Sequence, residues 1–571
     1  MSVGNLRWLV VLLSMTLVTA CKPEEPTGSS SREGQPLTSG YTLSQEEFNS
    51  LSKEDQYMVA TKVLSTMYRG LPLDQFLDLS NGLDIAPVQY INFISDTQIK
   101  LQTRMLNADR LAAMDTIFGK EESVPDANDD IPGMFTSIDS NHPHQTTMGF
   151  ILGYPISKDM FAHWMSFFLA NTIMFSPARE MDSTDSQDIS RTLSFLQGNL
   201  IADKPVREVV RSWLHNLSRW RVSRSAENHA LEMFELFLGQ FNDTPQEQQD
   251  TFNGGIACGS WYLTDDSQDY QLRQDPMARE NTPSVVVFGQ YISSCEELYD
   301  LVAGHPALMS RVTEVIAYYL LNGSSSAVRN EVIQSVVNSG AETFSDIFLG
   351  LIFSKAYLLH SERPKTFEEN ALGFLGNMHF TPRAGAYPLR YDMLNQLWNP
   401  NRSNFFAVHN MGWAAMDYKI GRLPFVPMDT LSFATYHKAI RENILKNDGA
   451  FDGHNFPRTS WFTESDEPRD PPYEIKDGAY FVAGTQDLKP SLQNLSLNDF
   501  IDYVFLSALG RRATDTEKTA FIDEGLRRVF LRNRDGAIGW DTESDADNWA
   551  EEMLDYISRL PEFYYYRAVN N

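Results

Sequence analysis

Apolar residues recur along much of the chain at the spacing of an amphipathic helix. Between residues 57 and 68 they fall on one helical face, and Gly70 ends the run. A second such run occupies residues 549–560, with Asp547 as a capping residue before it and Pro561 beyond its last turn. This periodicity predicts helices near both ends of the chain.

Helix starts are marked by a hydroxyl residue followed three positions later by a glutamate, the pattern of a capping box. It occurs at Ser44 with Glu47, at Thr244 with Glu247, and at Thr514 with Glu517. Strand-like runs are few, and the clearest extends from Val285 to Phe288. Helices should therefore dominate.

A pattern of helical hairpins repeats without a fixed period. An apolar helix ends at Gly239 or Gly510, and a polar turn then leads to Thr244 or Thr514, which caps the next helix. A looser copy ends at Gly323 and is followed by a serine run. Glycine supplies the left-handed residue that a sharp helix stop requires.

The fold class predicted from these patterns is mainly α, with several domains of helical hairpins or bundles and a small irregular or β-containing middle part. The expected divisions are a signal peptide at 1–20, a lipidated cysteine with a flexible stalk at 21–41, a helical N-terminal domain at 42–254, a middle domain at 255–384, an irregular aromatic-rich segment at 385–490 and a C-terminal helical module at 491–571.

The N-terminus has the features of a secretory signal. Arg7 precedes an apolar run from Trp8 to Val18, which is too short to span a bilayer as a mature helix. The sequence Val18-Thr19-Ala20-Cys21 resembles the lipobox of bacterial lipoproteins. That resemblance implies cleavage before Cys21 and acylation of its thiol and new amino group, and the alternative is an ordinary cleaved signal with a coincidental cysteine.

The lipid bilayer is thus an expected partner, reached through acylated Cys21. Two or more acyl chains, palmitate among them, make attachment stable. Lys22 is not the acidic residue that retains lipoproteins at the inner membrane in the enterobacterial rule, so the outer membrane of the cell envelope is favoured. Residues 22–41 are rich in Pro, Gly, Ser and charge, which is typical of a flexible stalk.

The net charge of the chain argues against nucleic-acid binding. The chain has 75 acidic and 47 basic residues, a formal net charge of −28, which repels polyanions and removes the counterion-release term that drives nucleic-acid binding. A hydrophobic fraction of 42% is ordinary for a folded protein.

The two cysteines beyond Cys21 are Cys258 and Cys295. Beyond the inner membrane the environment is oxidising, so a disulfide between them is the expected pairing, and two free buried thiols are the alternative.

Motifs near the C-terminus carry a patchy resemblance. Leu509-Gly510-Arg511, Thr514 to Glu517 and Leu560 to Phe563 resemble a helical unit of large bacterial secreted proteins. Ala202 to Val206 and Asn228 to Gly239 are similar to segments of planctomycete-type cytochrome c-associated proteins. The resemblance implies a haemless relative, because neither Cys258 nor Cys295 lies in the Cys-x-x-Cys-His motif that covalent c-type haem needs.

Two stretches carry the main candidate metal ligands. Asp126, Asn128 and Asp130 alternate as at the start of a calcium loop, but Ile131 and Ser137 replace the Gly and Glu that an EF-hand requires. His142 and His144, with Asp139 as a third ligand, would suit zinc or copper. Solvated loops are the alternative at both places, so no cofactor is expected.

Aromatic residues make up 12% of the chain and cluster between 398 and 418 and between 563 and 566. Most should be buried in a helical core, whereas an exposed patch of them would mark a contact surface.

These features favour an anchored envelope lipoprotein that acts as a binding or assembly component, with an envelope protein as partner. No catalytic signature was found. The alternative is an envelope hydrolase or carbohydrate-active enzyme whose site is assembled from scattered acids and histidines.

Overall fold

The structure is a computed structural model, and helices account for 67% of the residues that it describes. Those residues are 40–67, 77–78, 84–85, 165–166, 168–170, 172–174, 192, 195–196, 198–223, 225–266, 269–321, 323–365, 473–476, 479–482, 497–530, 553 and 556–569. The predicted fold class, mainly α with a small β-containing part, is confirmed.

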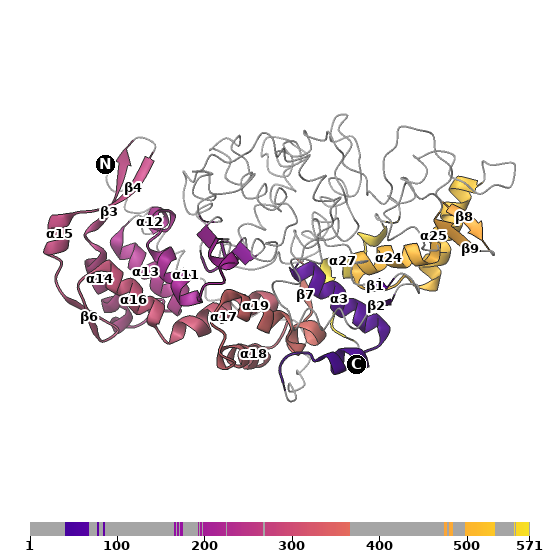
Figure 1. The fold of residues 1–571 in the computed structure, drawn as a ribbon, viewed down its shortest axis with the longest axis horizontal. Helices are drawn as coiled ribbons and strands as arrows, with labels where there is room; N and C mark the ends of the chain where they lie inside the picture. The colour runs from indigo at the N-terminus through magenta and orange to yellow at the C-terminus, as the bar shows by residue number, and fades with distance from the viewer. Residues whose placement is uncertain are drawn as a thin grey trace, which may run out of the picture.

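A first group of helices spans residues 206–304, which we call the disulfide module. Its helices are α11 (Val206–Leu214), α12 (Leu217–Ser223), α13 (Ala226–Leu238), α14 (Pro245–Cys258) and α16 (Cys295–Gly304). Between α14 and α16 lie β3 (Trp261–Asp266), β4 (Asp269–Gln274), α15 (Pro276–Glu280), β5 (Val285–Val287) and β6 (Gln290–Ile292). The strands form two antiparallel hairpins, β3 with β4 and β5 with β6. Figure 1 shows this module at one end of the described elements.

The next helices continue away from that end (Figure 1). They are α17 (Ala307–Leu320), α18 (Ser326–Asn338), α19 (Phe344–Ile352) and the short π-helix η2 (Ala356–His360). α17 packs against both α13 and α19, so the middle helices connect the disulfide module to the rest. Phe168 lies edge-on to Tyr319 and Phe348, with ring centroids 4.5 and 5.1 Å apart.

Segments from both ends of the chain meet at the other end of the described elements (Figure 1). We call this group the terminal module: residues 41–67, 353–365, 497–530 and 556–569. Its helices are α2 (Gln45–Ser50), α3 (Lys53–Met67), α24 (Leu497–Leu509), α25 (Asp515–Phe530) and α27 (Pro561–Tyr564). β7 (Arg363–Pro364) pairs with β10 (Tyr565–Tyr566), and the remaining short strands are β1 (Leu77–Asp78), β2 (Asp84–Ile85), β8 (Tyr473–Lys476) and β9 (Ala479–Val482).

Local signals predicted the helix ends well. The Ser44 box is complete, since the Ser44 hydroxyl accepts from Glu47 N and the Glu47 carboxylate accepts from Ser44 N. The Thr514 box with Glu517 is complete as well. Gly239 and Gly510 both have a φ of 69°, the left-handed conformation expected at these helix stops.

Gly323 serves another purpose. A Cβ on this residue would lie 1.8 Å from the backbone oxygen of Glu362, so only glycine allows the two backbone segments to approach this closely. The turn after α17 is therefore shaped by a tertiary contact rather than by a helix stop.

The expected division at 254/255 falls inside α14, and α3 packs directly against α24 although the two lie at opposite ends of the chain. Among the helices in the described ranges, none is long and apolar enough to cross a membrane.

Candidate functional site

A disulfide joins Cys258, the last residue of α14, to Cys295, the first residue of α16. The two Cα atoms are 4.3 Å apart, the sequence separation is 37, and both side chains are buried. The predicted pairing is thus confirmed. The bond closes the base of the segment 259–294, which carries both β-hairpins and α15, and we call this segment the disulfide lobe.

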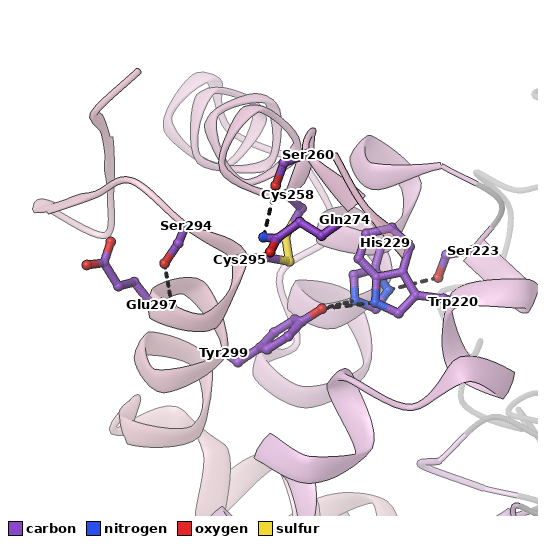
Figure 2. Close-up of a disulfide and its surroundings, with 10 residues drawn as sticks. All are labelled: Trp220, Ser223, His229, Cys258, Ser260, Gln274, Ser294, Cys295, Glu297 and Tyr299. Atoms are coloured by element: carbon purple, nitrogen blue, oxygen red, sulfur yellow. Dashed lines mark hydrogen bonds between the residues drawn. A yellow bond between two sulfur atoms is a disulfide. The ribbon is translucent and has the colours of Figure 1, made fainter. Parts of the chain in front are cut away.

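The lobe is anchored by caps as well as by the disulfide. Asp275 is the N-cap of α15 and its carboxylate accepts from Met277 N and Ala278 N, with Pro276 at the first helical position. The Ser294 hydroxyl accepts from Glu297 N at the start of α16 (Figure 2). Both caps are short-range and follow from the sequence.

The turn of the β5–β6 hairpin directs the Phe288 side chain into the protein. Phe288 and Gly289 have φ values of 50° and 76°, a conformation that costs a bulky residue free energy. The Phe288 ring packs 4.8 Å from the Phe234 ring and 5.0 Å from the His305 ring. Phe288 N also donates to the buried carboxylate of Asp250 at 3.1 Å. These contacts offset the strain and hold the hairpin against α13 and α14.

Beside the disulfide lies a buried network of four side chains (Figure 2). Trp220 Nε1 donates to the Tyr299 hydroxyl at 3.0 Å, and that hydroxyl lies 3.2 Å from His229 Nε2. His229 Nδ1 lies 3.1 Å from the Ser223 hydroxyl, which itself donates to Arg219 O. Since Trp220 can only donate, Tyr299 is free to donate to Nε2, and Ser223 can then accept from Nδ1–H. A neutral imidazole therefore suffices for its contacts with Tyr299 and Ser223.

Burial enforces that neutral state. His229 is fully buried and its ring stacks on Trp220, with centroids 4.2 Å apart. Burial, reinforced by the charge of Arg219, holds the pKa of His229 well below its usual value. Burial likewise raises the pKa of Tyr299. The network therefore supports the base of the lobe without exchanging protons near neutral pH.

The outside of the lobe displays large apolar side chains. Tyr291 is 80% exposed and Met277 68% exposed, and Tyr262 is exposed as well. Phe252, also exposed, lies on α14 next to Asn253, whose side-chain amide donates to Val286 O at 2.7 Å. Val286 is the cross-strand partner of Tyr291, so Phe252 and Tyr291 come from neighbouring elements.

The same region is strongly acidic. Residues 240–304 hold 11 aspartates and glutamates, two arginines (Arg273 and Arg279) and no lysine. Asp243, Asp275, Glu280, Glu297 and Asp300 are exposed. This region therefore combines exposed apolar side chains with exposed carboxylates.

A second cluster of polar side chains is buried in the terminal module. Lys62 and Arg363 are both nearly inaccessible, and the Arg363 guanidinium lies over the rings of Tyr319, Tyr357 and Tyr566, 4.7 to 5.7 Å from their centroids. Lys62 Nζ donates to Ser361 O at 2.7 Å. Burial and the charge of Arg363 hold the pKa of Lys62 well below its usual value. The tyrosine faces stabilise the Arg363 guanidinium.

The motifs that carried the resemblance near the C-terminus meet in space. Arg511 makes a bidentate pair with Glu517, at 2.9 and 3.0 Å, and Glu562 lies 3.5 Å from Arg511. Glu517 also accepts from Tyr556 and from Thr514. Although burial opposes it, hydrogen bonding to Arg511 and Thr514 lowers the pKa of Glu517 to about 2. Phe563, Tyr564 and Tyr566 are buried, as expected for aromatic residues of a helical core.

Several predicted site residues lie outside the described residues: Cys21, Asp126, Asn128, Asp130, Asp139, His142 and His144. Within the described ranges, no three His, Cys, Asp or Glu side chains are grouped so as to hold a metal ion. His229, Trp220 and Tyr299 were not predicted as a group, because nothing in their spacing indicates that they meet.

Comparison with known proteins identifies no relative: no family model matches the chain, and neither a curated protein nor a solved structure does.

Proposed function

We propose that the protein is an exported lipoprotein, tethered through acylated Cys21 at the outer membrane, that serves as a binding or assembly component of the cell envelope. The observation that carries the proposal is the buried disulfide at the base of the lobe. It supports both export and a fixed surface for contact.

Export is supported by redox chemistry. Protein disulfides form and persist in oxidising compartments and are rare in the cytosol. A bond between Cys258 and Cys295 accounts for both cysteines other than Cys21. Cys21 is thereby left for acylation, as its position in the lipobox-like sequence implies.

Binding is supported by the way the lobe is built. The disulfide closes the base of the lobe, the Phe288 contacts hold it against α13 and α14, and the neutral network around His229 lies beside the disulfide. Tyr262, Met277 and Tyr291 face solvent on that fixed frame. A preorganised surface loses little conformational entropy on association.

The tether is tested by intact-mass measurement of the native protein and by the Cys21→Ser variant. We expect the native chain to begin at Cys21 with a mass increase equal to its acyl groups, and to sediment with membranes. The variant should lack the acyl mass and should appear in the soluble fraction. An unmodified N-terminus on the native protein would refute the tether.

The binding role is tested by affinity capture from detergent-solubilised envelopes. A partner should be recovered in a constant molar ratio to the protein, and this ratio should not change when the sample is diluted before capture. Recovery of the protein alone from several detergents would contradict the proposal.

A further inference from the structure

The end of the disulfide module combines exposed apolar side chains with exposed carboxylates. Phe252, Met277 and Tyr291 are exposed apolar side chains on α14, α15 and β6, and all three elements lie at the same end of the described elements (Figure 1). Exposed carboxylates, including Asp275 and Glu280, lie in the same stretch of chain. Contact surfaces of proteins combine apolar anchors with a polar rim in this way.

Charge limits what this surface can bind. Anionic headgroups and nucleic acids would be repelled by the carboxylates. A symmetric contact with a second copy would place the same acidic patch on both sides. A basic protein surface is attracted, because complementary charge favours encounter and orientation.

We propose that Phe252, Met277 and Tyr291, together with Asp275 and Glu280, form a docking surface for a basic protein. Apolar groups of the partner pack against Tyr291 and Met277, and its lysines or arginines face Asp275 and Glu280. This inference rests on the proposed binding role and adds the surface and the chemistry of the partner.

The surface is tested by placing a photoreactive amino acid at Tyr291 or Met277 of the full chain in the cells that produce it. Ile201 is the control position, because it is also exposed, at 51%, and lies outside the surface. We expect positions 291 and 277 to cross-link the same basic protein, with a yield at least tenfold above that of position 201.

Charge is tested with the purified full chain and the protein identified by cross-linking. The variant Asp275→Asn/Glu280→Gln should bind it about five- to tenfold more weakly, and wild-type affinity should fall as salt is raised. Asparagine preserves the N-cap of α15, so the fold is retained. Glu314→Gln, an exposed site on α17, should leave the affinity unchanged.

Three outcomes would overturn the inference: adducts with lipid, glycan or a second copy, affinity that is indifferent to the charge variant, or equal yields from position 201. A partner that cross-links only at position 201 would retain the binding role while refuting this surface. Absence of any partner in both capture and cross-linking would refute the proposed function itself.

Discussion

The disulfide module and the terminal module solve the same problem of stability with different chemistry. The disulfide module is continuous in sequence, is closed by a covalent bond, and contains a buried network of neutral groups around His229. The terminal module joins segments hundreds of residues apart and relies on charged groups, among them Arg511, Glu517 and Arg363. From this comparison we expect that reduction destabilises the disulfide module and that strong acid destabilises the terminal module.

Loss of the disulfide should have the largest effect. Replacing both Cys258 and Cys295 by alanine should lower the free energy of unfolding by about 4 kcal/mol, the chain-entropy cost of a loop of this size. Denaturant unfolding with and without reductant measures it, and trypsin should cut faster at Arg273 and Arg279 in the variant. Reductant should destabilise the wild type and leave the variant unchanged. Equal unfolding midpoints for wild type and variant would contradict this role of the disulfide.

Breaking the Arg511–Glu517 pair should come next. The two side chains are only 17% and 10% exposed, so Glu517→Gln leaves the Arg511 charge poorly compensated and should cost about 2 to 3 kcal/mol. Glu314→Gln, which breaks an exposed pair with Arg311, should cost less than about 0.5 kcal/mol.

The Glu517→Gln variant also tests how the free energy of unfolding depends on pH in acid. Because the folded pKa of Glu517 is about 2, against an ordinary value of 4.5, its contribution is complete above about pH 4.5 and is lost as pH falls toward 2. The difference between wild type and Glu517→Gln should therefore shrink over this window. A difference that stays constant down to pH 2 would show that the carboxylate charge is not the cause.

Helix packing in the disulfide module should be sensitive to a single methyl group. A Cβ on Gly254 would lie 2.9 Å from the Ala230 Cβ and 3.2 Å from Leu298 Cδ2. Gly254→Ala should cost about 1 to 3 kcal/mol through overpacking of α14 against α13. Gly304→Ala is the control, since a Cβ there meets nothing within 4 Å, and thermal unfolding of both variants measures the difference. Equal melting temperatures would rule out close packing at Gly254.

The smallest effect should be the response of the disulfide module to mild acid. The pKa of His229 is lowered on folding, so the unfolded chain binds the extra proton, and stability is lost as pH falls below about 6.5. One such proton contributes a slope of at most about 1.4 kcal/mol per pH unit. His229→Gln should flatten the dependence between pH 6.5 and 5, whereas His305→Gln, at a less buried site, should flatten it less. If the slope were unchanged in His229→Gln, protonation of this histidine would not be the cause of the pH dependence.

Local features of the fold were predictable from the sequence. The capping boxes at Ser44 and Thr514 and the helix stops at Gly239 and Gly510 depend on residues within one or two turns of each other. The Cys258–Cys295 bond was predictable because an expected oxidising compartment and the cysteine count left one natural pairing. Such signals need no knowledge of long-range contacts.

Long-range features were not predictable. The Val285–Phe288 run was expected as one strand, but β5 ends at Val287 and Phe288 adopts a left-handed turn, because the free energy of burying its ring against α13 offsets the strain. The contact of Lys62 with Ser361, like that of Thr61 with Leu506, joins segments far apart in the chain, and no short motif records it. The tether, the metal candidates and the function remain predictions.

The way in which the chain enters the terminal module has a mechanical consequence. Just after Gly40, Leu43 N donates to Phe353 O at 2.9 Å, and Lys355 N donates to Tyr41 O at 2.8 Å. Tension arriving along the chain from residue 40 would be shared by these two bonds before it could reach α2. The load would then pass into the segment between α19 and η2. The disulfide lobe, with its exposed apolar side chains, would keep its shape under tension applied at residue 40.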